Sequence, residues 1–172
     1  MDNKYRTIYV VSFLAGLAIA IVLIVTLPAP KNGNPEKEIA SRSPAALDGY
    51  TYLQQLNKMA QEASSLVTNT APIFEQPIEN QDLKQSLVRI QKAKMSFLAF
   101  AQETESMNPP QEVKKYHKKI ISSFKKYHKG FELSEKALEE KNDAKLAKGQ
   151  DDINKGATEF FDATQLIVKA IK

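Results

Sequence analysis

The sequence contains no cysteine and no tryptophan, and it has only two histidines and six glycines. Without cysteine the chain can form neither disulfides nor thiolate metal sites, and it carries no cysteine nucleophile. The Gly-x-Ser-x-Gly, Gly-x-x-x-x-Gly-Lys and His-Glu-x-x-His motifs are also missing from it. These absences remove the usual residue sets of hydrolases, nucleotide-binding loops and zinc proteases. We therefore expect a protein that is not an enzyme and needs no cofactor.

The composition of the 172 residues is that of a folded chain, with 42% hydrophobic and 26% charged side chains. Lysine and arginine outnumber the acids by 24 to 20, which gives a formal net charge of +4. This length suffices for one domain, or for one domain together with a membrane anchor.

One long apolar run, Thr7–Leu27, lies near the start and carries no charge. At 1.5 Å per residue it would span about 30 Å, the thickness of a bilayer's hydrocarbon core. The run is longer than the roughly 7–15 residues of a signal-peptide core, and cleavage after Ala29 would place Leu27 and Pro30 at unsuitable positions. The sequence therefore predicts an uncleaved single-pass anchor rather than a cleaved signal peptide.

The charges that flank the apolar run indicate its orientation. Lys4 and Arg6 precede it, which is the layout of a signal-like basic segment. Lys31 and Lys37 follow it, so the positive-inside rule is nearly balanced. We expect residues 1–6 to form a short cytoplasmic tail, and we expect the body to lie outside the cytoplasm at the cell membrane.

Small residues recur inside the predicted anchor, because Ser12, Gly16 and Ala20 are spaced four apart. Such a stripe lets two helices approach closely, so a second copy or a partner helix could pack there. The alternative is that small residues are simply common in membrane helices. Residues 28–43 hold three prolines and mixed charges, which is typical of a flexible linker.

Residues 44–172 carry apolar side chains at spacings of three and four, and no stretch alternates for long enough to indicate a strand. We predict an all-α fold in which four helices form an antiparallel up-down bundle. Two glycines, Gly149 and Gly156, lie inside the fourth helix, where each costs about 1 kcal/mol relative to alanine. We expect them to admit close approach of a neighbouring helix; a hinge is the alternative.

Capping and breaking residues predict where these helices begin and end. The first is expected to begin at Pro44 behind an N-cap at Ser43, and its pattern stops near Thr70. A loop with apolar side chains is expected at Ala71–Glu79. The predicted N-cap of the second helix is Asn80, the break before the third is Asn108-Pro109-Pro110, and the predicted N-cap of the fourth is Asp143.

The third helix carries the densest charge pattern, with seven lysines and no acid from Lys114 to Lys129. At 100° per residue all seven fall in an arc from about 100° to 240°, opposite the apolar side chains. They are Lys114, Lys115, Lys118, Lys119, Lys125, Lys126 and Lys129. Two interpretations stay open: a solvated helix face, or a surface that binds polyanions such as teichoic acid or anionic lipid headgroups.

Nucleic acid and metal are not expected as ligands of this helix. Its aromatic residues fall on the core side, so they cannot form an exposed platform for base stacking. His117 and His128 share a face, but three turns separate them by roughly 16 Å, too far for one metal ion. Glu132 or Glu135 could pair with His128, yet two ligands do not make a site. We expect both histidines at the boundary of the core, where partial burial would make them weak pH sensors.

The C-terminal half resembles the helical domains of unknown function found in membrane- or lipid-anchored extracytoplasmic proteins of Gram-positive bacilli. The resemblance covers about residues 80–172. It rests on Asn108-Pro109-Pro110, Val113, Tyr116-His117-Lys118, Phe124, Phe131-Glu132-Leu133, Ala137, Asn142-Asp143 and the Ala157–Thr164 stretch. Many of those proteins carry a lipobox cysteine where this chain has an apolar run. The resemblance implies a place at the cell surface and carries no activity.

The sequence thus predicts a non-enzymatic, membrane-anchored envelope protein that presents a helical interaction domain outside the cytoplasm. Its expected partner is another protein or a second copy of the chain. The alternative is polyanion binding through the lysines of the third helix. A ligand-sensing bundle is disfavoured, because the expected cytoplasmic tail is too short to form an output domain.

Overall fold

The computed structural model describes residues 47–171. This part of the chain consists of four α-helices and two 3₁₀ turns and contains no strand, which confirms the predicted all-helical body. The elements are α2 (Gly49–Glu75), η1 (Ile78–Asn80), α3 (Leu83–Ser106), η2 (Gln111–Val113), α4 (Lys114–Glu139) and α5 (Asp143–Ile171).

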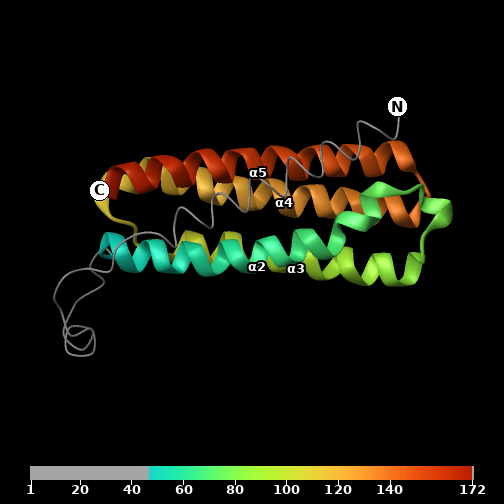
Figure 1. The fold of residues 1–172 in the computed structure, drawn as a ribbon, viewed down its shortest axis with the longest axis horizontal. Helices are drawn as coiled ribbons and strands as arrows, with labels where there is room; N and C mark the ends of the chain where they lie inside the picture. Colours follow the sequence, from blue (N-terminus) through green and yellow to red (C-terminus); the bar gives the residue numbers. More distant parts are fainter. Residues whose placement is uncertain (1–46, 172) are drawn as a thin grey trace.

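The four helices lie side by side as an elongated bundle, and short connections reverse the direction of the chain between them (Figure 1). Helices α4 and α5 form the closest pair, α3 packs against α4, and α2 contacts α3 and α5. Helix α2 therefore lies diagonally across the bundle from α4. At one end the Leu47 amide donates to the Asn108 carbonyl at 2.9 Å. We call this the entry end; α2 and α4 begin there, and α3 and α5 end there.

Aromatic side chains from three helices fill the centre of the bundle. The Phe97 ring stacks on Tyr127 with 4.3 Å between ring centres. It also stacks on Phe131, with 5.4 Å between ring centres. Phe124 packs against Phe160 of α5 at 5.3 Å. Each of these side chains is fully buried or nearly so, as the apolar spacing predicts. Met95 is an exception, because 58% of it is exposed although it lies beside the apolar stripe of α3.

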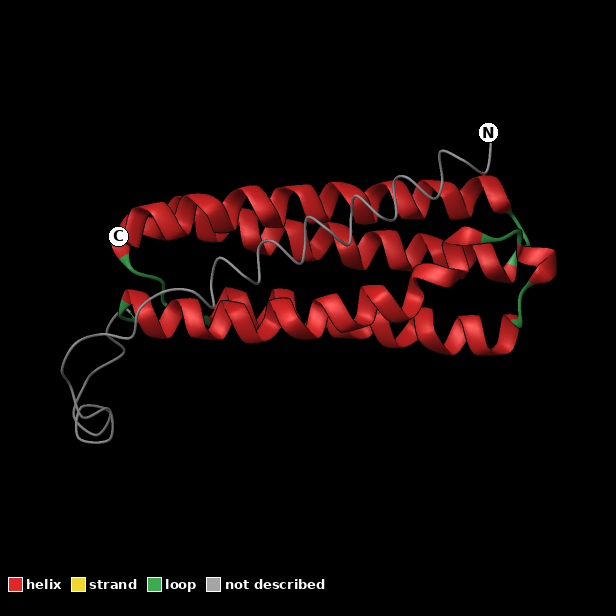
Figure 2. Cartoon of the chain, viewed as in Figure 1, coloured by secondary structure: helices red, strands yellow, loops and turns green. Residues whose placement is uncertain are grey.

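The first helix begins and ends later than predicted. Its N-cap is Asp48, whose carboxylate accepts from the Thr51 amide at 2.9 Å, while Ser43 and Pro44 lie outside the described residues. The predicted end near Thr70 and the loop after it are wrong, because α2 continues through Pro72 to Glu75. The side chains of Ile73 and Phe74 are buried there, and their burial offsets the hydrogen bond that proline removes. Figure 2 shows the last turns of α2 bent from the line of its earlier turns.

Two predicted N-caps are also wrong by one or two residues. Asp82 caps α3 by accepting from the Gln85 amide at 3.1 Å, and Asn80 lies in η1 instead. Asn142 accepts from the Lys145 amide at 3.0 Å and so occupies the capping position before α5. Asp143 is the first residue of α5, and its carboxylate accepts from the Ile78 amide at 3.1 Å. This hydrogen bond ties the connection between α2 and α3 to the start of α5.

Glycines explain why α4 and α5 approach so closely. A Cβ atom on Gly149 would collide with the Ser134 hydroxyl and lie 2.8 Å from the Gly130 carbonyl oxygen. A Cβ on Gly130 would lie 2.7 Å from the Gly149 carbonyl oxygen, and one on Gly156 would lie 3.0 Å from that of Ser123. The predicted close approach at Gly149 and Gly156 is therefore confirmed, and Gly130 is a third member that the sequence did not reveal.

Candidate functional site

The seven lysines of α4 lie on its outer side, and we call them the lysine surface. They are Lys114, Lys115, Lys118, Lys119, Lys125, Lys126 and Lys129; all are exposed except Lys126, which is half-buried. On the opposite side of the helix Ile120, Phe124 and Phe131 are fully buried in the core. The burial of that stripe fixes the rotation of α4 and turns the lysines to solvent, as the spacing predicts.

Only two of the seven lysines are neutralised by neighbouring helices. The ammonium of Lys125 lies 2.5 Å from the Glu105 carboxylate of α3, and that of Lys126 lies 3.0 Å from Glu159 of α5. The Lys115 ammonium lies 4.7 Å from the centre of the Tyr116 ring. Lys115 and the other four lysines (Lys114, Lys118, Lys119 and Lys129) form no ion pair with any residue in the described range 47–171. The surface therefore keeps most of its positive charge.

The lysine surface surrounds a wide, shallow hollow of about 370 Å³. It is lined by Lys118, Ile121, Ser122, Lys125, Lys126 and Lys129. The hollow is open to solvent, and half-buried Ile121 and Ser122 form its floor between the ammonium groups. Ammonium groups on flexible stems act as point charges that attract phosphate oxygens without fixed geometry. The arrangement can thus hold phosphate groups at an open surface, but it encloses no small molecule.

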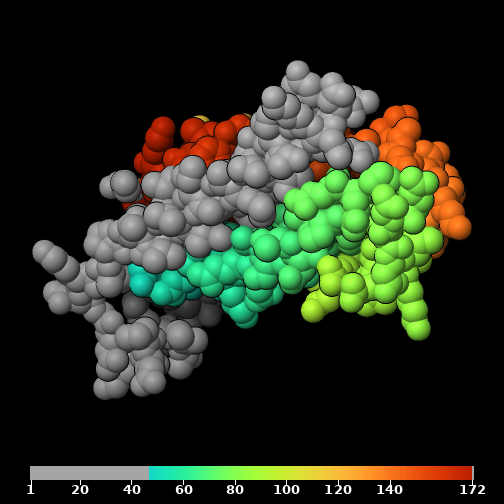
Figure 3. Space-filling view, turned by 45° about the vertical axis from the view of Figure 1, so that its right-hand side comes forward, coloured from blue at the N-terminus to red at the C-terminus, as the bar shows by residue number. Residues whose placement is uncertain are grey.

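Helix α2, parts of which are visible in cyan to green in Figure 3, provides a contrast to α4. It exposes Lys58 and Glu62, which have opposite charges and lie one turn apart. No comparable run of one charge occurs on this helix. Compared with α2, α4 therefore carries the long run of positive charge.

His117 lies beneath the lysine surface near the entry end, and it is buried rather than at the boundary of the core as predicted. Only 6% of it is exposed, and its Nδ1 is hydrogen-bonded to the Tyr52 hydroxyl of α2 at 3.0 Å. Burial lowers the pKa of the His117 imidazole below its ordinary value, because the charged form loses its hydration. The same burial raises the pKa of the Tyr52 hydroxyl.

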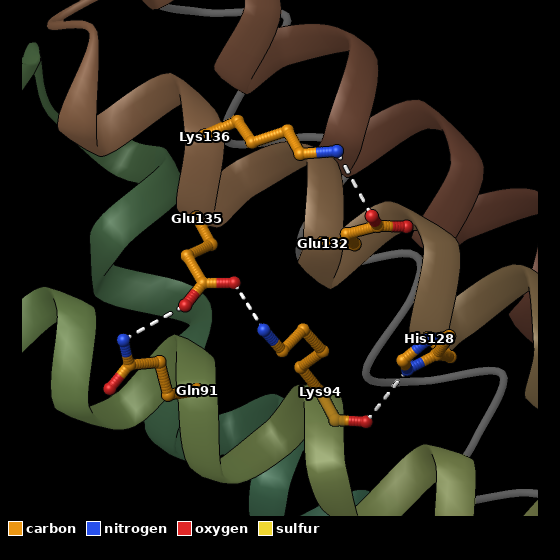
Figure 4. Close-up of polar contacts among 6 residues, drawn as sticks. All are labelled: Gln91, Lys94, His128, Glu132, Glu135 and Lys136. Atoms are coloured by element: carbon orange, nitrogen blue, oxygen red, sulfur yellow. Dashed lines mark hydrogen bonds and ion pairs between the residues drawn. The ribbon is translucent and has the colours of Figure 1, made fainter.

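His128 is half-buried and engages α3 rather than a carboxylate (Figure 4). Its Nδ1–H donates to the Lys94 carbonyl oxygen at 3.0 Å. Glu135 pairs instead with the Lys94 ammonium and accepts from the Gln91 amide at 2.8 Å. Burial opposes the ionisation of Glu135, but these two hydrogen bonds outweigh it and lower the pKa of the carboxyl. The suggested pairing of His128 with Glu135 is thus wrong.

Glu132, the other carboxylate considered for His128, pairs with Lys136 at 3.0 Å on the same helix (Figure 4). The hydrogen bond from Lys136 lowers the pKa of the Glu132 carboxyl. Within residues 47–171 no three or more His, Asp or Glu side chains are grouped so as to hold a metal ion. His117, His128 and Glu135 therefore contact neighbouring helices, whereas Glu132 forms an ion pair within α4.

Sequence reasoning located the lysines but missed their partners. Glu105 and Glu159 lie on other helices, so their pairing with Lys125 and Lys126 depends on the register of the bundle. The sequence contains no local signal for that register, since both acids lie outside the range of helical i, i+4 spacing.

No protein-family model, no curated protein and no solved structure matches this chain. Among the described helices none has a segment long and apolar enough to cross a membrane. The predicted anchor at Thr7–Leu27 and the small residues Ser12, Gly16 and Ala20 lie outside the described residues. The anchor, its packing stripe and the resemblance to Gram-positive surface domains stay predictions.

Proposed function

We propose that this chain is a non-enzymatic, single-pass membrane protein whose helical body, outside the cytoplasm, binds phosphate-bearing polyanions through the lysine surface. The observation that carries this proposal is the solvent-facing side of α4 from Lys114 to Lys129, which holds no acid and where five of seven lysines lack an ion partner among residues 47–171. A helix with this much charge of one sign attracts polyanions over a distance of several ångströms and at physiological salt.

The proposed binding is electrostatic and has a recognisable salt dependence. Lysine ammonium groups that contact phosphates release the counterions of the polyanion, so the affinity falls as the salt concentration rises. Contacts of this kind do not require a closed pocket, in agreement with the shallow hollow between the lysines. Anionic polymers of the envelope and lipid headgroups share the phosphate chemistry that the surface would recognise.

The test uses the full-length protein in neutral detergent micelles with fluorescent long-chain polyphosphate as the probe. The variant replaces three unpaired lysines: Lys114→Gln, Lys118→Gln and Lys119→Gln. The matched control, Lys58→Gln with Lys84→Gln and Lys92→Gln, removes the same charge from exposed positions on α2 and α3. We expect at least a tenfold loss of affinity for the first triple variant and less than a twofold loss for the control. An equal loss in both would show that only net charge matters and would contradict the proposal.

The anchor and the topology have a separate test. A C-terminal epitope on intact cells should be removed by external protease while a cytosolic control survives, and alkaline carbonate should leave the protein in the membrane. An epitope that resists protease in wall-free protoplasts would place the body on the cytoplasmic side. Release by carbonate would contradict the anchor at Thr7–Leu27.

A second candidate function is binding of a protein partner or of another copy of the chain. Val88 and Met95 are 60% and 58% exposed, and they are the exposed large hydrophobic residues of the described body. They lie seven residues apart on α3, so they share a face. Association through this face should tolerate high salt and be lost in the double variant Val88→Gln, Met95→Gln. Polyanion binding, in contrast, should be weakened by high salt and unaffected by the double variant. Cross-linking in cells would detect the protein–protein association itself.

A further inference from the structure

We propose that the lysine surface docks on acidic lipid headgroups of the same membrane that anchors the chain, with the lysines nearest the entry end in contact first. This inference rests on the proposed function, because it requires both the anchor at Thr7–Leu27 and a surface that binds phosphate. It commits the surface to one occupant, a negatively charged bilayer.

The position of the lysines in the fold is the first argument. The described chain enters the bundle at Leu47, which is hydrogen-bonded to Asn108 just before α4 begins. The Tyr52–His117 hydrogen bond joins the first turns of α2 and α4 at the same end. A chain that arrives from a membrane anchor therefore meets the bundle at the end where the lysine surface starts (Figure 1).

The distribution of unpaired charge along α4 is the second argument. Lys114, Lys115, Lys118 and Lys119 lie nearest the entry end and have no ion partner within residues 47–171. The two lysines that are neutralised, Lys125 and Lys126, lie further along the helix. The N-terminus of α4 adds the positive end of its own dipole to the unpaired lysines. The attraction for an anionic surface is therefore strongest at the part of α4 closest to the point where the chain enters.

The shape of the surface favours a bilayer over a polymer strand. The hollow among the lysines is shallow and lacks the walls that would enclose a chain of phosphates. Ile121 lies half-buried at its floor, and Tyr116 lies half-buried beside Lys115 near the start of the helix. Tyrosine and long-stemmed lysine side chains are suited to the headgroup region, where one end of each is apolar and the other polar.

The length of the tether permits this contact. Residues 28–46 can span at most about 65 Å, and the lysine surface from Lys114 to Lys129 is only about 22 Å long. Tethering also keeps the body at a high effective concentration near the bilayer, so weak contacts are sufficient. Each lysine close to an acidic surface favours binding by about fivefold, so three neutralised lysines should weaken docking on the order of a hundredfold.

The absence of cysteine makes a site-specific test straightforward. The full-length protein carries one introduced cysteine with a fluorophore, either Ser122→Cys at the centre of the lysine surface or Ser65→Cys on the exposed face of α2. It is reconstituted in vesicles whose lipids bear a nitroxide quencher on the headgroup. One vesicle type is rich in phosphatidylglycerol, and the other contains phosphatidylcholine alone.

Docking predicts quenching of the Ser122→Cys label in phosphatidylglycerol vesicles, with little quenching in phosphatidylcholine and none of the Ser65→Cys label. Added salt should abolish the quenching. Lys114→Gln, Lys118→Gln and Lys119→Gln together should abolish it too, whereas the Lys58, Lys84 and Lys92 control triple should not. Circular dichroism of both triple variants checks that the helices are retained.

Three results would overturn the inference, and they separate it from the proposed function. An unquenched Ser122→Cys label in phosphatidylglycerol vesicles, with polyphosphate binding intact in micelles, would reject membrane docking and leave polyanion binding standing. Loss of both would reject both proposals. Equal quenching at Ser122→Cys and Ser65→Cys, or in the two vesicle types, would show that the body approaches the bilayer without using the lysine surface.

Discussion

At the scale of single residues, burial distinguishes the two histidines more strongly than their spacing suggested. Both lie on one side of α4, yet His117 is buried against Tyr52, whereas His128 is half-buried and donates to the Lys94 carbonyl. Their difference depends on which helix lies opposite: α2 covers the first and α3 the second. The helical spacing in the sequence predicts that the two histidines share a face. Which helix packs against each of them depends on how the bundle assembles.

The buried His117 should make stability depend on pH between neutrality and mild acid. Burial lowers its pKa in the folded state, so near the ordinary value of about 6.5 the unfolded chain binds a proton that the folded chain does not. Stability is therefore complete above about pH 7 and decreases as the pH falls through about 6.5 toward the folded-state value. Thermal melts of the full-length protein between neutrality and about pH 5.5 should show a falling Tm.

The variant His117→Gln isolates this effect, because glutamine can still bond the Tyr52 hydroxyl but does not titrate. We expect it to be less stable than the wild type at neutral pH and to have a nearly flat Tm over the same interval. The lowered carboxyl pKa values of Asp48 and Glu132 act separately, since their contribution is lost only below about pH 4.5. A wild-type slope that persists in His117→Gln would contradict the assignment.

At the scale of helices, the apolar spacing predicted that the four helices exist. It did not predict the residues at which they end or the neighbours that they contact. Pro72 signals a helix end, but α2 continues past it because Ile73 and Phe74 bury their side chains. Asn80 and Asp82 are both good capping residues. Because η1 includes Asn80, the N-cap of α3 is Asp82 instead. A local capping or proline preference contributes about 1–3 kcal/mol to the position of a helix end. It competes with the burial of side chains, which depends on the folded arrangement.

The glycines of α4 and α5 give a graded test of helix approach. A Cβ at Gly149 would meet the Gly130 backbone oxygen at 2.8 Å, a contact that cannot move aside, whereas at Gly156 the nearest atom lies at 3.0 Å. Overpacking costs roughly 1–3 kcal/mol and alanine returns about 1 kcal/mol of helix propensity. Urea unfolding should therefore show a loss of up to about 2 kcal/mol for Gly149→Ala and a smaller change for Gly156→Ala. The reverse order would mean that the helices separate easily at Gly149.

The Asp143 carboxylate is expected to hold the α2–α3 connection against α5. Replacing it by alanine removes the acceptor of the Ile78 amide, which should lower the free energy of unfolding by about 1 kcal/mol. Asp143→Asn keeps an oxygen at that position and should retain most of the stability. Amide hydrogen exchange at Ile78 should accelerate in the alanine variant alone. Equal exchange at Ile78 in both variants would show that the Asp143 carboxylate does not protect this amide.

At the scale of the whole molecule, the lysine surface carries charge that the fold does not need. Lys114 and Lys118 lie four residues apart, as do Lys115 and Lys119, and such like-charged pairs each cost about 0.2–0.5 kcal/mol. The first turn of a helix is also the least favourable place for a cation, because the helix dipole is positive there. The glycine contact and the aromatic core stabilise the bundle without these residues. Exposed lysines that cost stability and form no ion pair with a neighbouring helix of the described body, such as Lys114, Lys118 and Lys119, are typical of a binding function.

This opposition leads to a prediction in which stability and binding change in opposite directions. Neutralising Lys114, Lys118 and Lys119 to glutamine relieves their repulsion, so the free energy of unfolding should rise by about 0.5–1 kcal/mol at low salt. The same variant should bind polyphosphate at least tenfold more weakly. Added salt should reduce the stability difference from the wild type, since it screens the repulsion that the substitution removes. If the triple variant instead loses stability, the lysines contribute to the fold, and weaker binding could not be attributed to the loss of a binding surface.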